Sequence, residues 1–310
     1  MNPRILILGA AGMSMAVQMQ KMPDVAQTIL TQGALSTQPG GIAGALSIAL
    51  ARQGADVYLC ARLGNDANGA RLSKFYMNAN VHTQYIAVNP DLPTYTSCHF
   101  AEKDTPCRTA IFEGAAATLT PSHIDNAFSM MPQALFMTWE GNPQILKYAA
   151  SVAEERALPV FLEISPVTDA IDLSDMPHIS VLTVNEDAAY ALTGVRPSGT
   201  DSCLMAGMAL QKLLDADYYI IRLGKRGAHI YDGIYCHSVA PFVVPVADAS
   251  GAGVAFNAAL AYAYLSNGGD ILEAARYGNA AGALTVQKNG FYKALPTLEE
   301  TQAFLRSRHR

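Results

Sequence analysis

The sequence of 310 residues is long enough for one large α/β domain or two smaller ones. Half of its residues are hydrophobic and 15% are charged, which indicates a globular protein with a large core and excludes a disordered chain. The formal net charge of −5 argues against nucleic-acid binding driven by charge, because the short terminal stretch RSRHR is the sole Lys/Arg-rich run.

The cysteines and histidines give no sign of a structural metal site. Five cysteines are scattered without a CxxC pair, which is typical of a reducing compartment, and seven histidines show no ligand spacing such as HExxH. No apolar stretch approaches the roughly 18 residues that a membrane-spanning helix needs. The apolar run near the N-terminus is too short for a signal sequence and favours a first strand. We therefore expect a cytoplasmic protein with neither membrane nor nucleic acid as a partner.

The first part of the chain alternates between expected strands and helices. Residues 4–9 form an apolar run that is typical of a buried strand in a parallel sheet. Residues 40–54 predict a helix that begins at glycines, followed by a strand at 55–64 and a helix at 68–80. The stretch from about 92 to 114 differs, because β-rich segments surround the polar turn EKDTP, and it predicts a hairpin.

The alternation resumes after the hairpin and continues almost to the end of the chain. The expected strands are 134–139, 158–164, 179–185 and 217–224. The expected helices are 143–157, 186–194, 203–215, 252–266, 270–288 and 297–306. A second hairpin at 227–239 turns at Asp232-Gly233, a pair typical of tight β-turns. Strands that alternate with helices predict a mostly parallel, doubly wound sheet in a single domain, 1–310.

The stretch ASGAGVAFNAALAYAYL places small residues at the start of an expected helix. Backbone N–H groups are unpaired at such a position, and the helix dipole favours negative charge there. Gly251, Ala252 and Gly253 therefore predict an anion hole for a phosphoryl group. The alternative is a tight glycine turn that leads into a buried helix.

Two further glycine-containing stretches suggest ligand contacts. In QPGGIAG, Gly40 and Gly41 permit the close approach of a substrate hydroxyl or phosphate, although the stretch also fits a plain helix start. In IIRLGKRGAHIYDG, Arg222 and Lys225 are candidates for contacts with nucleotide phosphates, and the alternative is a solvated charged turn. The stretch LGAAG lacks the GxGxxG spacing, so a dinucleotide-dependent oxidoreductase is poorly supported.

Taken together, these stretches resemble the ribokinase-like (PfkB) carbohydrate kinase family nearly from end to end. The segment PGGIAGALSIALARQGADVYLCARLGNDANGARL resembles its N-terminal signature, with Gly64, Asp66 and Gly69 as the later GxDxxG. DASGAGVAF resembles its C-terminal signature. The remaining similar stretches are VNEDAAYALTG, RLGKRGAHIYDG, GNAAGALTVQKNG and LPTLEE.

The resemblance implies a fold and an activity. The fold is a three-layer α/β/α sandwich with a mostly parallel sheet and a small β lid, here formed by segments near 29–38 and 92–114. Members of the family transfer the γ-phosphoryl group of ATP, with Mg²⁺, to a hydroxyl of a sugar or nucleoside. An aspartate after the GAG turn acts as base. In some members the lid also builds a dimer, and we expect a homodimer here.

The resemblance also assigns residues to sites. It implies a nucleotide site formed by Asn185, Arg222, Gly224, Lys225, Gly227 and Asn279. It implies a substrate site formed by Ser14, Gly40, Gly41 and Ala45, and it links Asp248 to a cation site.

The sequence departs from the family at several of these positions. Val254 stands at the place of the base, so no catalytic residue is intact. Ser14, Ala45 and Ala188 stand where the family has an aspartate, an asparagine and an acid, although Asn185 is kept. Loss of a general base costs about 10²–10⁴-fold in rate, so we expect weak or lost activity.

Two hypotheses remain open. The first is a kinase with a relocated base, for which Glu140, Glu163 and Asp248 are candidates. Asp248 is the poorest of the three, because it matches the family's acid near the cation. The second hypothesis is a non-catalytic pseudokinase that binds a nucleotide or another small ligand and acts by closing its lid.

Overall fold

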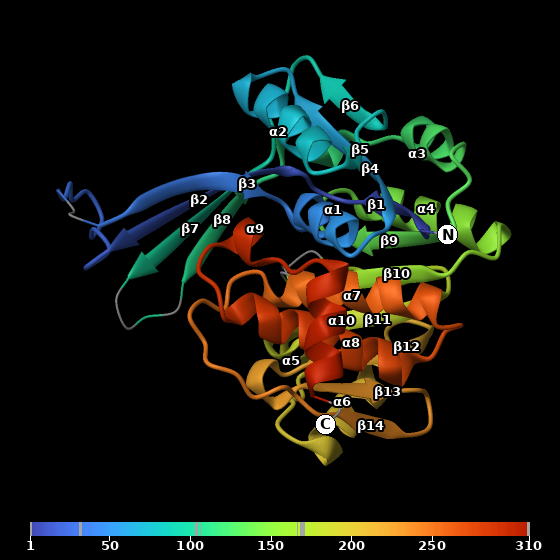
Figure 1. Ribbon diagram of the computed structural model, residues 1–310. Helices are drawn as coiled ribbons and strands as arrows, with labels where there is room; N and C mark the ends of the chain where they lie inside the picture. The colour runs from blue at the N-terminus through green and yellow to red at the C-terminus, as the bar shows by residue number, and fades with distance from the viewer. Residues whose placement is uncertain are drawn as a thin grey trace.

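The computed structural model describes residues 2–30, 33–102, 105, 107–165, 167 and 171–308. Its centre is a main sheet in the order β14-β13-β12-β11-β10-β9-β1-β4-β5, with β6 paired to β4 (Figure 1). The strands are β1 (Arg4–Leu8), β4 (Asp56–Gly64), β5 (Val81–His82), β6 (Ile86–Asn89), β9 (Ala134–Thr138), β10 (Val160–Ile164), β11 (Ile179–Asn185), β12 (Ala216–Arg222), β13 (Ala228–Tyr231) and β14 (Cys236–Val239). Neighbours from β12 to β5 pair in parallel, whereas β13 and β14 pair antiparallel.

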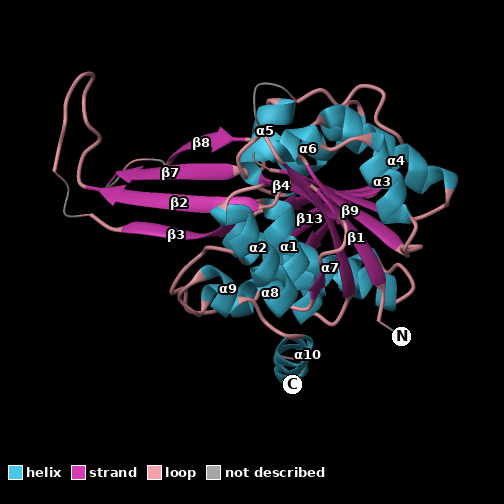
Figure 2. Ribbon diagram, turned by 90° about the horizontal axis from the view of Figure 1, so that it is seen from above, coloured by secondary structure: helices cyan, strands magenta, loops and turns pink. Residues whose placement is uncertain are grey.

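Helices cover both faces of the main sheet, which gives the expected three layers (Figure 2). One layer contains α1 (Ile42–Arg52), α7 (Ala252–Ser266), α8 (Ile271–Val286) and α10 (Leu298–Ser307), with α2 (Ala67–Asn78) beside it. The other contains α3 (Pro121–Phe128), α4 (Pro143–Glu155), α5 (Glu186–Thr193) and α6 (Thr200–Gln211). Strand β1 shows why both layers form: Ile5 and Ile7 enter the core under α1 and α7, and Leu6 and Leu8 enter the opposite core.

A second, small sheet projects from the main body (Figure 1, left). Its order is β3-β2-β7-β8, from β3 (Leu35–Gly40), β2 (Gly12–Met19), β7 (Thr96–Glu102) and β8 (Arg108–Phe112). The expected hairpin is present, because β7 and β8 pair antiparallel. Residues 31, 32, 103, 104 and 106 of the two predicted segments lie outside the described residues.

The sequence analysis missed β2, which lies between the two predicted segments and keeps them from pairing directly. β2 is parallel to β7 and antiparallel to β3. A signal was available, because the methionines at 13, 15 and 19 follow the period of two that a strand requires.

Asp66 fastens the base of the small sheet to the main body. Its carboxylate accepts hydrogen bonds from the N–H of Gly69 (2.8 Å) and from the N–H (2.8 Å) and hydroxyl (2.7 Å) of Thr94. It thus caps α2 and holds the segment that leads into β7. These hydrogen bonds favour the charged carboxylate and hold the pKa of Asp66 below its usual range, against the effect of burial.

Within the described part of the chain, no helix is both long and apolar enough to cross a membrane.

Candidate active site

The candidate site lies at the carboxyl edge of the main sheet, where parallel α/β proteins bind ligands. Helix α1 begins there after Gly41, and its Gly44 N–H donates to the carbonyl of Ala10, just beyond β1. Glu140 lies just beyond β9 and bonds to the first residue of α1. The site therefore combines a helix start with the ends of two neighbouring strands.

The start of α7 has the geometry of an anion site. Gly251 is its N-cap, with φ of 84°, a left-handed conformation that favours glycine. In the described part of the chain, no acceptor lies within hydrogen-bond reach of the N–H groups of Gly251, Gly253 or Val254. The N–H of Ala252 makes one long bond of 3.4 Å to the carbonyl of Ala249. Unpaired N–H groups and the positive end of the helix dipole suit an anion, so the geometry is compatible with the predicted anion hole.

Val254 is partly buried and packs against the core under α1 and α7. Its isopropyl group can neither accept a proton nor carry a charge. The position that the resemblance aligns with the base is therefore apolar.

The predicted substrate residues divide into two groups. Ser14 and Gly40 are adjacent in β2 and β3, since a Cβ atom built on Gly40 would lie 2.8 Å from the Cβ of Ser14. Gly41 follows as the N-cap of α1, with φ of 78°. Ala45, in contrast, is only 3% exposed within α1. A ligand can therefore contact the residues around Ala45 but not Ala45 itself. The structure therefore brings Ser14, Gly40 and Gly41 together and places Ala45 behind them.

Glu140 connects the glycine pair with the small sheet. Its Oε2 accepts a hydrogen bond of 2.7 Å from the N–H of Ile42, and its Oε1 accepts one of 2.8 Å from the hydroxyl of Tyr95. Burial raises the pKa of Glu140 to about 7, and the two hydrogen bonds partly oppose this effect. A carboxyl group with this pKa changes charge near neutral pH.

The other two candidate bases are engaged in structural contacts. Glu163 in β10 pairs with Arg222 at 2.6 Å and accepts a hydrogen bond of 2.5 Å from Asn257. Asp248 accepts bonds from the N–H groups of Ser250 (2.9 Å) and Gly290 (3.3 Å). The hydrogen bonds with Ser250 stabilise the charged carboxylate and are the main reason that the pKa of Asp248 lies below its usual range. Asp248 is therefore a poor proton acceptor at neutral pH.

The predicted nucleotide residues are in part structural. Asn185 caps α5 by accepting from the N–H of Ala188 at 2.7 Å, and Asn279 donates to the carbonyls of Val239 (3.1 Å) and Ala240 (3.0 Å). The first turn of α5 contains the carboxylates of Glu186 and Asp187, whereas Ala188, which the resemblance aligns with an acid, offers none.

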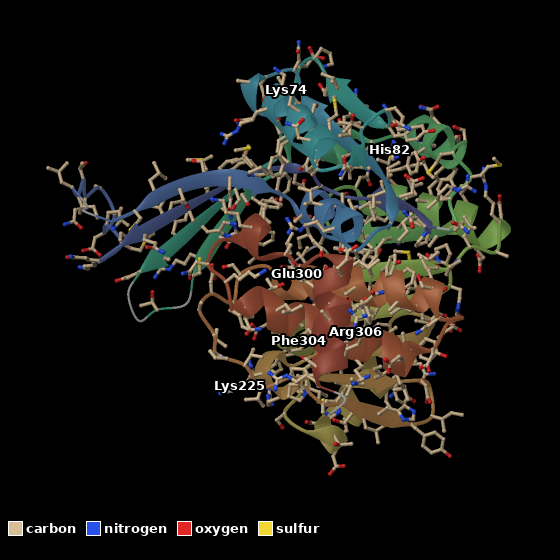
Figure 3. The ribbon with its side chains drawn as sticks, viewed as in Figure 1. Lys74, His82, Lys225, Glu300, Phe304 and Arg306 are labelled. Carbon is tan, nitrogen blue, oxygen red and sulfur yellow. The ribbon has the colours of Figure 1, made fainter. Side chains whose placement is uncertain are left out.

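The loop after β12 is the accessible part of the predicted nucleotide site. Gly224 and Gly227 bracket a short 3-10 turn, η2 (Gly224–Arg226), and both have positive φ, at 55° and 83°. Lys225 is exposed on this turn, on the same side of the molecule as the small sheet (Figure 3). Its ammonium group is therefore free to reach a ligand.

A closing segment that the sequence analysis did not single out completes the site. Helix α9 (Phe291–Ala294) places the ring of Phe291 3.4 Å from where a Cβ atom of Gly251 would lie. The hydroxyl of Tyr292 donates to the carbonyl of Pro39 at 3.0 Å. α9 thus links the start of α7 to the glycine pair. The aromatic pair after Gly290 was the available signal in the sequence.

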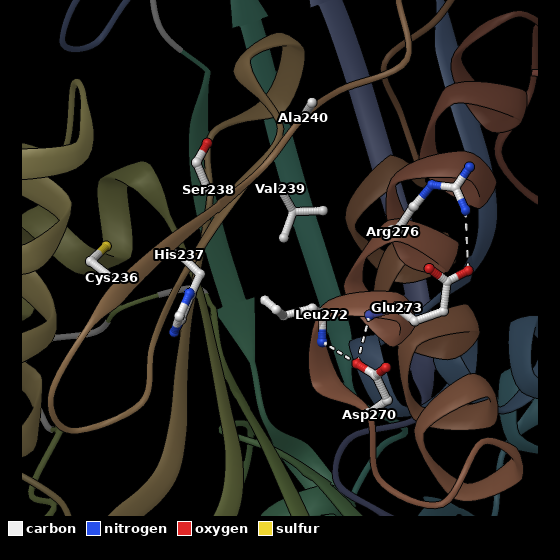
Figure 4. Close-up of a pocket in the computed structure, with 9 residues that line it drawn as sticks. All are labelled: Cys236, His237, Ser238, Val239, Ala240, Asp270, Leu272, Glu273 and Arg276. Atoms are coloured by element: carbon white, nitrogen blue, oxygen red, sulfur yellow. Dashed lines mark hydrogen bonds and ion pairs between the residues drawn. The ribbon is translucent and has the colours of Figure 1, made fainter. Parts of the chain in front are cut away.

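Two surface cavities in the described part of the chain lie away from these residues. A groove of about 660 Å³ lies between β14 and the start of α8 (Figure 4). Its polar groups are engaged, because Asp270 caps α8 and Glu273 pairs with Arg276. A second cavity of about 850 Å³ is lined by residues such as Arg4, Asp56 and His82. Neither cavity is lined by a residue predicted for the site. The candidate site is therefore defined by the helix starts and strand ends described above.

The donor set does not match a preformed metal centre. Among the described residues, no group of three or more His, Cys, Asp or Glu side chains is placed to hold a metal ion. The first turn of α5 has Ala188 at the position of the family's acid. The described residues therefore form no ready-made cage for Mg²⁺.

Known proteins match this chain over nearly its whole length. Residues 4–298 match the family described as pfkB family carbohydrate kinase. The ribokinase of Bacillus subtilis (strain 168) is 27% identical over 303 residues, which cover 97% of this chain and 99% of that protein. The ribokinase structure from Giardia lamblia aligns with a TM-score of 0.89 at 18% identity, over 99% of this chain and 100% of that one. The Arabidopsis thaliana ribokinase structure complexed with ribose and ATP aligns with a TM-score of 0.83 at 22% identity, over 99% of both chains. The chain therefore belongs to the pfkB family of carbohydrate kinases.

Proposed function

We propose that this protein binds ATP and a small hydroxylated molecule, a sugar or a nucleoside, and that it transfers the γ-phosphoryl group slowly or not at all. The observation that carries the proposal is the start of α7, where free N–H groups precede Val254. An anion site of this kind stabilises phosphate through the backbone and does not depend on the side chain at position 254. Deprotonation of the acceptor hydroxyl does depend on that side chain in the family.

Two parts of the site support the two ligands. The substrate would lie beside Ser14, Gly40 and Gly41, where glycine leaves room for a hydroxyl group close to the backbone. The nucleotide would lie between the α7 start and the loop with Lys225. The Arabidopsis relative, whose structure contains ribose and ATP, supports this choice of ligands.

A second candidate function is an active kinase in which Glu140 replaces the missing base. The raised pKa of Glu140, about 7, favours this candidate, because a general base is most effective when its pKa is near the working pH. Its position beside Ile42, next to the glycine pair, also favours it. Both functions require the same ligands and differ only in the rate of transfer.

We also propose that the small sheet acts as a lid and as the interface of a homodimer. Its outer strands β3 and β8 expose Leu35 (66%) and Phe112 (61%). Exposed edge strands with apolar side chains tend to associate with other strands. The contact between Tyr95 and Glu140 would let the lid act on the site.

Calorimetric titration with ATP and an ADP-release assay over a panel of sugars and nucleosides test the proposal. We expect ATP binding, with turnover well below the usual range of about 1–10³ per second. Turnover within that range that Glu140→Gln reduces by about 10²-fold or more would establish the second candidate instead. Absence of ATP binding would reject both.

A further inference from the structure

Arg222 lies in an unusual place for a charged side chain. It is the last residue of β12, and its side chain is 10% exposed. Its Nη2 is 2.6 Å from Oε1 of Glu163, whose side chain is 4% exposed. A Cβ atom built on Gly253 would lie 2.5 Å from Nη1 of Arg222. The guanidinium group therefore packs directly against the first turn of α7.

The partners of Arg222 fix its position. The second oxygen of Glu163 accepts a hydrogen bond of 2.5 Å from Nδ2 of Asn257, which lies further along α7. Glu163 thus joins strand β10 to β12 and α7, and neither of its oxygens is left for a role as base. An arginine held in this way needs little reorganisation to meet a ligand.

The arginine still has unused donors. Its Nε is buried and has no hydrogen-bond partner among the described residues. Its Nη1 has no acceptor within the described ranges either. A buried donor without a partner costs free energy unless water or a ligand satisfies it.

The charge at this place also favours an anion. The N-terminus of a helix carries partial positive charge, so a cation beside it is unfavourable. Arg222 adds a full positive charge beside the free N–H groups of Gly253 and Val254. Glu163 balances the guanidinium charge only, and the residue at 254 adds no negative charge. An anion at the start of α7 removes this electrostatic conflict.

We propose that Arg222 is a binding residue of the α7 anion site, where its guanidinium donates to a phosphoryl oxygen together with the N–H groups of Gly253 and Val254. The chemical class of the ligand is a phosphate ester or anhydride, such as the phosphate chain of a nucleotide. Gly253 is required because any side chain there would displace Nη1. The inference rests on the proposed ATP binding, but it concerns the phosphate alone and can be tested without it.

The variants must avoid leaving Glu163 buried without a partner, because that alone destabilises a protein. Glu163→Gln combined with Arg222→Gln removes both charges and leaves the net charge unchanged. Arg222→Lys keeps the charge but has no planar fork for two hydrogen bonds. Arg276→Gln is the matched control, because it removes an arginine that is also ion-paired, in α8 beside the distant groove.

Isothermal titration with ATP, with inorganic pyrophosphate and with adenosine measures the effect. We expect the double variant to weaken binding of ATP and pyrophosphate about 10–100-fold, as for loss of a charge-assisted hydrogen bond. Arg222→Lys should give an intermediate loss, and adenosine affinity should change less than about twofold in every variant. Arg276→Gln should bind all three ligands as the unaltered protein does.

Two results would overturn the inference. One is phosphate affinity that the double variant leaves unchanged, or that the unaltered protein lacks. The other is a parallel fall in ATP and adenosine affinity together with a lower Tm, which indicates a purely structural role. If pyrophosphate binding depends on Arg222 but ATP binds no better than pyrophosphate and no ADP is released, the proposed function fails and the anion site remains.

Discussion

The hydroxyl of Tyr95 donates a hydrogen bond of 2.8 Å to Oε1 of Glu140, and this bond joins the small sheet to the carboxyl edge of the main sheet. Tyr95 follows Thr94, which Asp66 holds against α2. The N–H of Met13 also donates to the carbonyl of Tyr95 at 2.9 Å. The ionisation of Glu140 therefore takes place where the small sheet is anchored.

The raised pKa of Glu140 predicts a loss of stability as pH rises. The pKa of about 7 in the folded protein exceeds the ordinary value of 4.5, so the unfolded chain releases the proton first. The stabilisation of the protonated form is complete below pH 4.5 and is lost as pH rises to about 7. Partial exposure of Glu140 limits the loss, which we expect to be about 1–2 kcal/mol. Urea unfolding at pH 5 and pH 8 measures it.

Glu140→Gln is the comparison for this pH dependence. Glutamine stays neutral, so the free energy of unfolding of the variant should fall less between pH 5 and pH 8 than that of the unaltered protein. Glu113→Gln is a control, because it removes an exposed acid that precedes η1 (Gly114–Thr118). An equal pH dependence in the unaltered protein and Glu140→Gln would show that Glu140 ionises normally.

Two tyrosines near the site should respond to the same substitution in opposite ways. Tyr292→Phe removes the hydrogen bond of 3.0 Å to Pro39 and leaves that carbonyl without this donor, so we expect a loss of about 1 kcal/mol. Tyr76 is fully buried, and its hydroxyl has no hydrogen-bond partner among the described residues. Tyr76→Phe should therefore be neutral or stabilise by up to about 1 kcal/mol. Denaturant titration of both variants checks the difference in sign.

An equal decrease in the free energy of unfolding of Tyr292→Phe and Tyr76→Phe would contradict this prediction. Such a result would mean that the Tyr76 hydroxyl has an unseen partner such as buried water. Ring packing is a poor alternative explanation, because phenylalanine keeps the edge-to-face contacts of Tyr292 and Tyr76 with Phe75.

The sequence predicted most of the main sheet because its strands are apolar on both faces and its helices are punctuated by glycine. Residues 5–8 and 134–137 are examples, since buried parallel strands leave a continuous apolar run. Strand β2 was missed because half of its positions are polar or small and it begins at Gly12, shortly after Gly9. Its partner β7 is distant in the sequence, so no local turn signalled the pairing.

The local sequence also predicted the positions of the two helix starts but not the contacts that complete the site. Gly41 and Gly251 are caps because their positive φ angles suit glycine. The ion pair of Arg222 with Glu163 joins residues 59 positions apart, and the bond of Tyr292 to Pro39 joins residues 253 positions apart. Such pairings follow from strand order, which a single sequence does not specify.

Charged substitutions on the small sheet test the proposed homodimer. Leu35→Asp and Phe112→Asp place negative charge on exposed apolar positions of β3 and β8. We expect the unaltered protein to sediment as a dimer and at least one variant to sediment as a monomer with an unchanged Tm. Met131→Asp is the control, because Met131 is equally exposed (67%) but lies beyond α3. A purely monomeric unaltered protein at high concentration would reject the dimer, and the lid would be tested separately.

Val254→Asp tests whether the missing base alone limits phosphoryl transfer. A correctly placed base contributes about 10²–10⁴-fold to rate. We expect an increase of less than about tenfold, because the resemblance aligns Ser14, Ala45 and Ala188 with groups that hold substrate and metal, and these three residues cannot replace them. The new carboxylate would also stand next to Gly253, against which Arg222 packs. An ion pair with Arg222 would lower the basicity of the aspartate and fill the place of the phosphate.

The two explanations of a weak effect differ in their result for nucleotide affinity. If the introduced carboxylate pairs with Arg222, ATP should bind less tightly to Val254→Asp than to Val254→Asn, which is similar in size but uncharged. If the substrate contacts alone are limiting, the two variants should bind ATP equally and differ only in their rates of ADP release. A rise of about 10²-fold or more in the rate for Val254→Asp would contradict both explanations. It would show that the remaining site is competent and that a carboxylate at position 254 is the one group it needs.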